Sequence, residues 1–137
     1  MKLNPYLYFN GDCKAAFTFY EKCLNGTNLV LMTHAGTPAE ATTAPEWLDK
    51  IIHARLTVGD VLLMGSDAPT EHFKTPQGFS VTLGFDDPAE AERVYNALLE
   101  KGVATMPLAE TFWAKKFGML IDQFGTPWMI NCENRPA

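Results

Sequence analysis

The chain has 137 residues, of which 47% are hydrophobic and 20% are charged. This balance is typical of one folded globular domain and excludes an intrinsically disordered chain. The 11 basic residues are outnumbered by 16 acidic ones, so the formal net charge is −5. Because nucleic-acid binding depends mainly on neutralising phosphates, we expect no nucleic-acid partner.

The sequence contains no signal for a membrane or for export. A transmembrane helix needs an apolar run of about 18 residues, and none is present. Asn4, Asn10 and Asp12 interrupt the start of the chain, which therefore lacks the apolar core of a signal peptide. The three cysteines show no Cys-x-x-Cys spacing. We expect reduced thiols, a cytoplasmic location and no membrane partner.

The first half of the chain predicts a strand, a helix and three further strands. The first strand ends near Phe9, Asp12 is expected to cap the helix, and Gly26 ends it. Gly59-Asp60 predicts a hairpin turn. The segment 35–50 reads as a loop with a helical turn near its end, in which Trp47 is either a lid or a packing residue. The buried helical stripe is expected to hold Ala16, Phe17, Tyr20, Cys23 and Leu24, and the three strands to span 27–34, 51–58 and 61–66.

The second half repeats this order at a constant offset of roughly 76 positions. Asp87 is a predicted N-cap, Glu90 completes a capping-box pattern, and Gly102 is a predicted left-handed stop. The sequence therefore predicts an α+β fold of two tandem βαβββ modules within one domain, 1–137. The buried stripe is expected to hold Ala91, Val94, Tyr95, Leu98 and Leu99, the last three strands to span 104–109, 116–122 and 126–132, and the modules to cover about 1–68 and about 79–137, joined by a linker at about 69–78.

Several segments resemble the PhnB-like proteins of the vicinal oxygen chelate superfamily, which includes glyoxalase I, extradiol dioxygenases and bleomycin-resistance proteins. The resemblance covers essentially the whole chain. It implies that the two modules form a cupped mixed sheet with helices on the convex face and a small-molecule ligand in the concave one. It also implies homodimers. The segments that carry it are 5–13 (PYLYFNGDC), 52–55 (IHAR), 110–115 (ETFWAK), 117–118 (FG), 122–125 (DQFG) and 127–131 (PWMIN).

Strand alternation assigns side chains to the two faces of each sheet. Ile52, Ala54, Leu56 and Val58 are uniformly apolar and are expected to pack on the helix, which turns His53 into the cup. His53 and Glu110 are the catalytic candidates, and the alternatives are a structural histidine and a carboxylate that caps a turn or pairs with Lys115. The candidate ligand-binding residues are Tyr6, Tyr8, Arg55, Phe112, Trp113, Met129 and Asn131. Arg55 could instead form an exposed salt bridge, and the two aromatics could be interface anchors.

The positions that hold metal in the superfamily carry no usual ligands here. The resemblance places them at Asn4 or Pro5, at Leu63 or Met64, at Ser80 and at Met129. None is a usual ligand for Zn²⁺, Ni²⁺ or Fe²⁺, so we expect no metal and no cofactor. A displaced site that combines His53 with Glu110 or Asp67 is the alternative.

These observations favour a PhnB-like protein that binds a small, partly aromatic or apolar molecule in the cup. Whether it is an enzyme stays open. The alternatives are a metal-dependent lyase or isomerase with a displaced site, an antibiotic-sequestering protein of the resistance type, and a scaffold whose cup is closed by side chains. Some PhnB-like sequences carry a label as ubiquinone methyltransferases, but no segment here resembles a cofactor site for methyl transfer.

Overall fold

The structure, a computed structural model, describes residues 1–133. These residues form two four-stranded sheets, each with one α-helix, in the predicted order of strand, helix and three strands, repeated once. The chain divides into two compact units, and the boundary falls between Lys74 and Thr75. No helix in the described residues is both long enough and apolar enough to cross a membrane.

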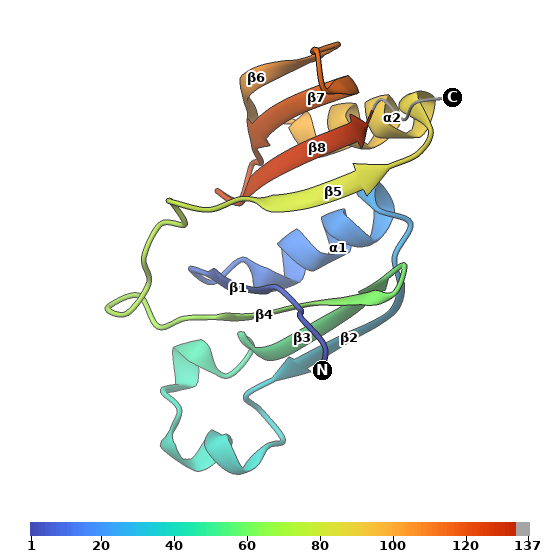
Figure 1. The fold of residues 1–137 in the computed structure, drawn as a ribbon. Coiled ribbons are helices and arrows are strands. Elements are labelled where there is room, and N and C mark those ends of the chain that lie inside the picture. Colours follow the sequence, from blue (N-terminus) through green and yellow to red (C-terminus); the bar gives the residue numbers. More distant parts are fainter. Residues whose placement is uncertain (134–137) are drawn as a thin grey trace. The chain divides into compact units, whose positions relative to one another are not determined.

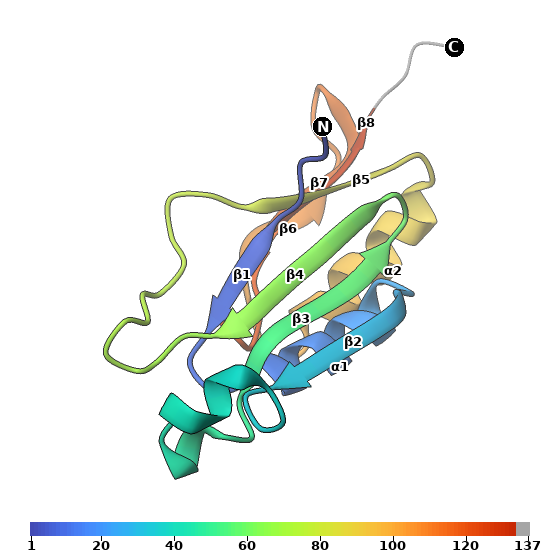
Figure 2. The ribbon, with the colours of Figure 1, turned by 90° about the horizontal axis from the view of Figure 1, so that it is seen from below.

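In the first unit, one helix packs on a sheet whose strand order is β1-β4-β3-β2 (Figure 2). β1 and β4 are parallel, and the other neighbours are antiparallel. The predicted loop contains two short 3₁₀ turns, Pro38–Thr42 and Pro45–Trp47. The elements are β1 (Tyr6–Phe9), α1 (Cys13–Cys23), β2 (Thr27–Thr33), β3 (Ile51–Val58) and β4 (Val61–Asp67).

The apolar stripe of α1 is buried as predicted except at Leu24, which follows the helix and is half-buried. Phe17 and Tyr20 are fully buried, with ring centroids 5.8 Å apart, and Phe9 of β1 packs 6.0 Å from Phe17. Such aromatic contacts add to the free energy gained from apolar burial. The hairpin at Gly59-Asp60 is also confirmed, because Val58 pairs with Val61 and Gly59 has a positive φ of 57°.

The start of α1 differs from the prediction. Asp12 precedes the helix, but its side chain forms no capping hydrogen bond. The backbone N–H groups of Gly11 and Cys13 instead donate to Oδ1 of Asp67, at 3.0 and 2.9 Å. Oδ2 of Asp67 accepts a hydrogen bond from the N–H of Ile51 at 2.8 Å. A carboxylate from the end of β4 therefore holds the helix start, because unpaired amides there need an acceptor.

The alternation predicted for β3 holds in its centre and fails at its start. Ala54 and Leu56 are fully buried, whereas Ile52 is only half-buried and Ile51 is buried in its place. The register with β2 shifts at this point, since Met32 pairs with His53 but Thr33 pairs with Ile51. One extra residue in β3 reverses the faces of the residues that precede it.

In the second unit, α2 packs on a sheet whose strand order is β5-β8-β7-β6 (Figure 1). β5 and β8 are parallel, which matches β1 and β4 of the first unit. A buried carboxylate, Asp122, organises the turn before β8, because it accepts hydrogen bonds from the N–H groups of Phe124 and Thr126 and from Nε1 of Trp128. The elements are β5 (Val81–Phe85), α2 (Pro88–Leu99), β6 (Val103–Ala109), β7 (Ala114–Ile121) and β8 (Pro127–Glu133).

The N-cap of α2 is confirmed, but its capping box is not. The side chain of Asp87 accepts a hydrogen bond from the N–H of Ala89 at 3.0 Å. The Glu90 carboxylate is paired with the Arg93 guanidinium at 2.6 Å, one turn along the helix. This pairing lowers the pKa of Glu90. The buried stripe of α2 is as predicted except at Leu99, which is half-buried.

The glycines after the two helices are needed because there is no room for a side chain, and not because their backbone is left-handed. The left-handed residues are Asn25, with φ 51°, and Lys101, with φ 57°, and not Gly26 or Gly102. A Cβ at Gly26 would lie 2.5 Å from Cδ1 of Leu56. One at Gly102 would lie 2.5 Å from the carbonyl oxygen of Ile121. The predicted role of Gly102 as a left-handed stop is therefore wrong, and glycine is required there for close approach.

Candidate functional site

Each sheet has one face that packs on its helix and one face turned away, which we call the distal face. In the first unit, Gly65 faces α1, because a Cβ there would lie 2.8 Å from the Phe17 ring. Leu7 and Ala54 pair with Gly65 and share its face. Their neighbours along the strands, Tyr6, Tyr8, His53 and Arg55, therefore belong to the distal face.

Three of the predicted residues on this face lie together. The Tyr6 hydroxyl is 3.5 Å from Nδ1 of His53, and the two ring centroids are 5.9 Å apart. The Tyr8 ring lies 5.1 Å from that of Tyr6, and Tyr8 is 56% exposed. Aromatic surface beside a polar pair is typical of small-molecule sites.

Arg55 lies on the same face, in the same cross-strand row as Tyr6. Tyr6 pairs with Met64, and Met64 pairs with Arg55. The Arg55 side chain is exposed, and no carboxylate among residues 1–133 forms a salt bridge with it. The salt bridge considered as the alternative is thus not seen within this part of the chain. A guanidinium in this position can donate two parallel hydrogen bonds to an anionic group.

The distal face of the second unit is rich in methionine. Met129 pairs with Met119, which pairs in turn with Met106 of β6. In the next row, Asn131 pairs with Phe117 and with Gly84. Methionine side chains are flexible and adapt to different apolar partners. Met129 and Asn131 share this face because Trp128, Ile130 and Cys132 are buried on the other one.

The aromatic segment predicted as a site lies between β6 and β7. The Trp113 ring is in edge contact with Phe112 at 4.7 Å and with Phe117 at 5.3 Å. Phe112 is 94% exposed and Trp113 44% exposed, so neither is a core residue of its unit. Glu110 is also exposed, and it forms no ion pair with Lys115 within residues 1–133. Because His53 and Glu110 belong to different units, their cooperation stays a prediction.

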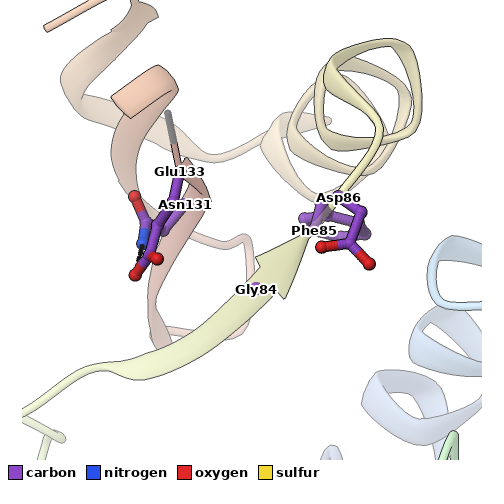
Figure 3. A pocket seen from close by; sticks show the side chains of 5 residues that line it. All are labelled: Gly84, Phe85, Asp86, Asn131 and Glu133. Carbon is purple, nitrogen blue, oxygen red and sulfur yellow. Dashed lines mark hydrogen bonds between the residues drawn. The ribbon is translucent and has the colours of Figure 1, made fainter. Parts of the chain in front are cut away.

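A hollow of about 360 Å³ lies where β5 and β8 end (Figure 3). Among its lining residues, only Asn131 was a candidate from the sequence. The others are Gly84, Phe85, Asp86 and Glu133. The sequence held a partial signal for this site, since acidic residues follow the apolar part of both strands. It did not show that the two strands are parallel neighbours and end side by side.

The resemblance would place metal ligands at positions that include Asn4, Leu63, Met64 and Met129. The side-chain oxygen of Asn4 accepts a hydrogen bond from the N–H of Leu62 at 3.1 Å, and Leu63 is buried on the helix side. Met64 and Met129 offer only thioethers, which are poor ligands for Zn²⁺ or Fe²⁺. Within residues 1–133, no three His, Cys, Asp or Glu side chains form a group that could hold a metal. Asp67 does not join His53, because its carboxylate is engaged on the opposite face of the sheet.

Cys13 is not an activated thiol. Its position at the start of α1 could favour the thiolate, but burial raises its pKa far above the usual range, and Asp67 and Asp12 raise it further. Its role is that of a small, fully buried residue at the first position of the helix.

Comparisons with known proteins place the chain in a family. Residues 1–131 match the family model described as 3-demethylubiquinone-9 3-methyltransferase. The chain is 32% identical to protein YjdN of Escherichia coli K12, over 96% of this chain and 95% of that protein. It is similar to protein PA1353 of Pseudomonas aeruginosa, at 44% identity and a TM-score of 0.89, covering 98% of this chain and 99% of the other.

More distant structures share the fold. A protein of Bacillus cereus described as a putative 3-demethylubiquinone-9 3-methyltransferase, PhnB protein, has a TM-score of 0.76 at 23% identity, covering 96% and 99% of the two chains. A glyoxalase/bleomycin resistance protein/dioxygenase family enzyme of Burkholderia phytofirmans has a TM-score of 0.65 at 13% identity, covering 94% and 95%. The chain therefore belongs to the 3-demethylubiquinone-9 3-methyltransferase family, as a PhnB-like protein with the glyoxalase/bleomycin-resistance/dioxygenase fold.

Proposed function

We propose that the protein binds a small aromatic molecule with an anionic group on the distal face of its first unit. The observation that carries this proposal is the cluster of Tyr6, Tyr8 and His53, with the Tyr6 hydroxyl 3.5 Å from Nδ1 of His53. The aromatic part of the ligand stacks on the tyrosines, and its polar substituent exchanges hydrogen bonds with Tyr6 and His53.

Arg55 supplies the charge that selects an anion. It lies two strands from Tyr6 in the same row, about 10 Å away at the usual spacing of strands. The length of the arginine and tyrosine side chains brings their ends within the span of one aromatic acid. Because the guanidinium is always charged, this preference holds over the physiological pH range.

The experiment measures binding of 1-naphthoate by NMR or calorimetry, with the neutral 2-naphthol as the comparison. Arg55→Gln should weaken naphthoate binding about tenfold and leave naphthol binding unchanged, because one charge-assisted contact is lost. Tyr6→Ala should weaken both probes. Arg93→Gln is the matched control, since Arg93 lies exposed on α2 in the second unit, where it pairs with Glu90. Equal naphthoate affinity in the native protein and the Arg55→Gln variant would overturn the proposal.

A catalytic use of the same site would require His53 as an acid or base, with Glu110 as the second candidate. Removing His53 would then abolish turnover but leave binding of the substrate nearly intact, whereas a purely binding role predicts the loss of affinity alone. The alternative of a displaced metal site makes a different prediction. It requires that the purified protein holds a stoichiometric transition metal and loses it in the His53→Ala variant.

We further propose that the protein is a cytoplasmic homodimer. The exposed aromatic side chains of Phe112 and Trp113 support a protein interface in the second unit, because such residues are enriched at interfaces. The three cysteines are buried and none forms a disulfide in the described residues, which suits a reducing compartment. Light scattering on the native protein and on a Phe112→Ser, Trp113→Ser double variant tests the dimer. A monomeric native protein would contradict it.

A further inference from the structure

We propose that three methionines on the distal face of the second unit, Met106, Met119 and Met129, form a binding site for Cu⁺. Met119 of β7 pairs with Met106 of β6 on one side and with Met129 of β8 on the other, and we call this set the methionine row. The proposal does not rest on the function proposed for the first unit, because it concerns other residues and another kind of ligand.

The side chains of the methionine row share one face of the sheet and are open to solvent. Gly118, the neighbour of Met119, faces α2, because a Cβ there would lie 2.8 Å from Cε2 of Tyr95. Met119 therefore points to the distal face, and its two partners point the same way. Met106 is 42% exposed, and Met119 and Met129 are half-buried. An ion in solution can thus reach the row.

The spacing of the three strands allows the sulfur atoms to meet at one ion. Neighbouring strands lie about 4.8 Å apart. Two sulfur atoms bound to the same ion, at a bond length of about 2.3 Å each, lie about 4 Å apart. Methionine has three rotatable side-chain bonds, so the outer side chains of Met106 and Met129 can bend toward Met119 in the centre.

The helix holds two of the three donors in register. The pairing of β6 with β7 shifts on both sides of Met106. The Tyr95 hydroxyl donates a hydrogen bond to the carbonyl oxygen of Met106 at 3.0 Å and lies 3.3 Å from that of Met119. Because this contact fixes the backbone of both residues, less conformational entropy is lost when their side chains bind an ion.

The donors select a soft ion of low charge. Thioethers are soft ligands that suit Cu⁺, whereas carboxylates and waters suit hard divalent ions. None of the described residues that pair in the two flanking rows is charged, so no carboxylate there would neutralise a divalent cation. These residues are Ala109, Phe117 and Asn131 in one row and Val103, Ile121 and Pro127 in the other.

The thiols of the chain are shielded from such an ion. Cys13 and Cys132 are fully buried, and Cys23 is 4% exposed. Thiolates are also soft ligands, but these three are not accessible in the folded protein. A Cu⁺ ion in solution therefore meets thioethers first.

The test is an NMR titration of the full-length protein, labelled with ¹³C in the methionine methyl groups. Ag⁺ is the first probe, since it is soft, monovalent and stable in air, and Cu⁺ follows under nitrogen. The chain has six methionines. We expect saturable shifts for the three of the methionine row, while Met1, Met32 and Met64 stay unchanged and serve as internal controls. Zn²⁺ should shift none of these signals, because thioethers are poor ligands for it.

Variants of similar side-chain volume separate the role of sulfur from that of packing. Met119→Leu removes the central donor and should weaken Ag⁺ and Cu⁺ binding at least about tenfold. Met32→Leu, at an exposed position of the first unit, is the matched control and should bind as the native protein does. No saturable shift, equal shifts of all six methionines at one affinity, or native affinity in the Met119→Leu variant would each overturn the inference.

The same experiments keep this site apart from those considered for the first unit. Cu⁺ should remain bound in the His53→Ala variant, whereas a displaced metal site at His53 would lose its metal there. Naphthoate binding through Arg55 should be the same in the native protein and in Met119→Leu. The proposals therefore fail separately.

Discussion

At the scale of single residues, Asp67 shows how one carboxylate joins three parts of the first unit. It is 6% exposed, and its two oxygens accept N–H groups from Gly11, Cys13 and Ile51. The sequence predicts that Asp67 follows the last strand of the first module and offers it only as a possible metal ligand. Its partners are up to 56 positions away, so no local pattern could identify them.

Replacing Asp67 by asparagine should lower the free energy of unfolding by about 2–4 kcal/mol. The side-chain N–H₂ group would face backbone donors, and one or more buried N–H groups would lose their acceptor. Urea denaturation of the native protein and the variant measures the change. Asp49→Asn, at an exposed loop position, is the control and should stay within about 0.5 kcal/mol of the native protein. A similar small effect at Asp67 would contradict the anchoring role.

The buried thiols lead to a second prediction at this scale. Cys13, Cys23 and Cys132 are all buried, and burial raises the pKa of Cys13. In the unfolded chain Cys13 ionises near pH 8.5, whereas in the folded protein it stays protonated. Stability should therefore fall as the pH rises above about 8.5, and Cys13→Ala should remove part of this fall. The measurement is chemical denaturation at several pH values. A pH dependence identical in both proteins would refute the assignment.

At the scale of secondary-structure elements, the two helices show what sequence patterns can and cannot predict. The buried stripes were predicted because they depend on the helical period alone. The way each helix begins was predicted only for α2, whose cap Asp87 is the adjacent residue. α1 takes its cap from another strand, and the bulge in β3 depends on its pairing with β2. Such features follow from non-local contacts.

In the candidate sites, too, the features set by a local sequence pattern were predicted and those set by non-local pairing were missed. Strand alternation correctly placed Ala54 and Leu56 on the helix side, and the structure brings Tyr6, Tyr8 and His53 together on the other face. The hollow beside Asn131 was missed, because it depends on the parallel pairing of β5 with β8. Alternation assigns a face, but it does not show which strands are neighbours.

For the two glycines that follow the helices, we predict that substitution by alanine lowers the stability by different amounts. Gly26→Ala should cost about 1–3 kcal/mol, because the new methyl group would press on the movable side chain of Leu56. Gly102→Ala should cost more, since its neighbour is the backbone carbonyl of Ile121. Thermal denaturation ranks the two. In a Leu56→Ala background the cost of Gly26→Ala should shrink, while that of Gly102→Ala should not. A larger loss of stability for Gly26→Ala than for Gly102→Ala would show that the packing argument is wrong.

At the scale of the whole molecule, the chain consists of two units with the same order of elements. In each unit the helix covers one face of a four-stranded sheet, and large apolar side chains stay exposed elsewhere. Examples are Tyr8 and Met32 in the first unit and Met106 and Ile121 in the second. A unit of roughly 65 residues buries too little apolar surface to be stable with such a surface uncovered. The formation of a single cup by both units remains a prediction.

Expressed alone, residues 1–74 should therefore be unstable or aggregate. We expect a broad thermal transition without cooperativity, in contrast to a sharp transition for the full chain. Circular dichroism during heating and light scattering measure the two properties. As a control, the full chain cut within residues 68–78 should recover cooperativity when both halves are present. A sharp, independent transition of residues 1–74 would contradict this view.

The parallel pairing of β1 with β4 also has a kinetic consequence. The β3–β4 hairpin closes over two residues, but Gly11 and Asp67 are 56 positions apart when they form their hydrogen bond. Closing so long a loop costs conformational entropy. The chain loses this entropy before the contact between Gly11 and Asp67 can stabilise it. We therefore expect the hairpin to form early and β1 to join late. The Asp67 hydrogen bonds would then form after the transition state, so that their loss speeds unfolding and leaves the rate of folding almost unchanged.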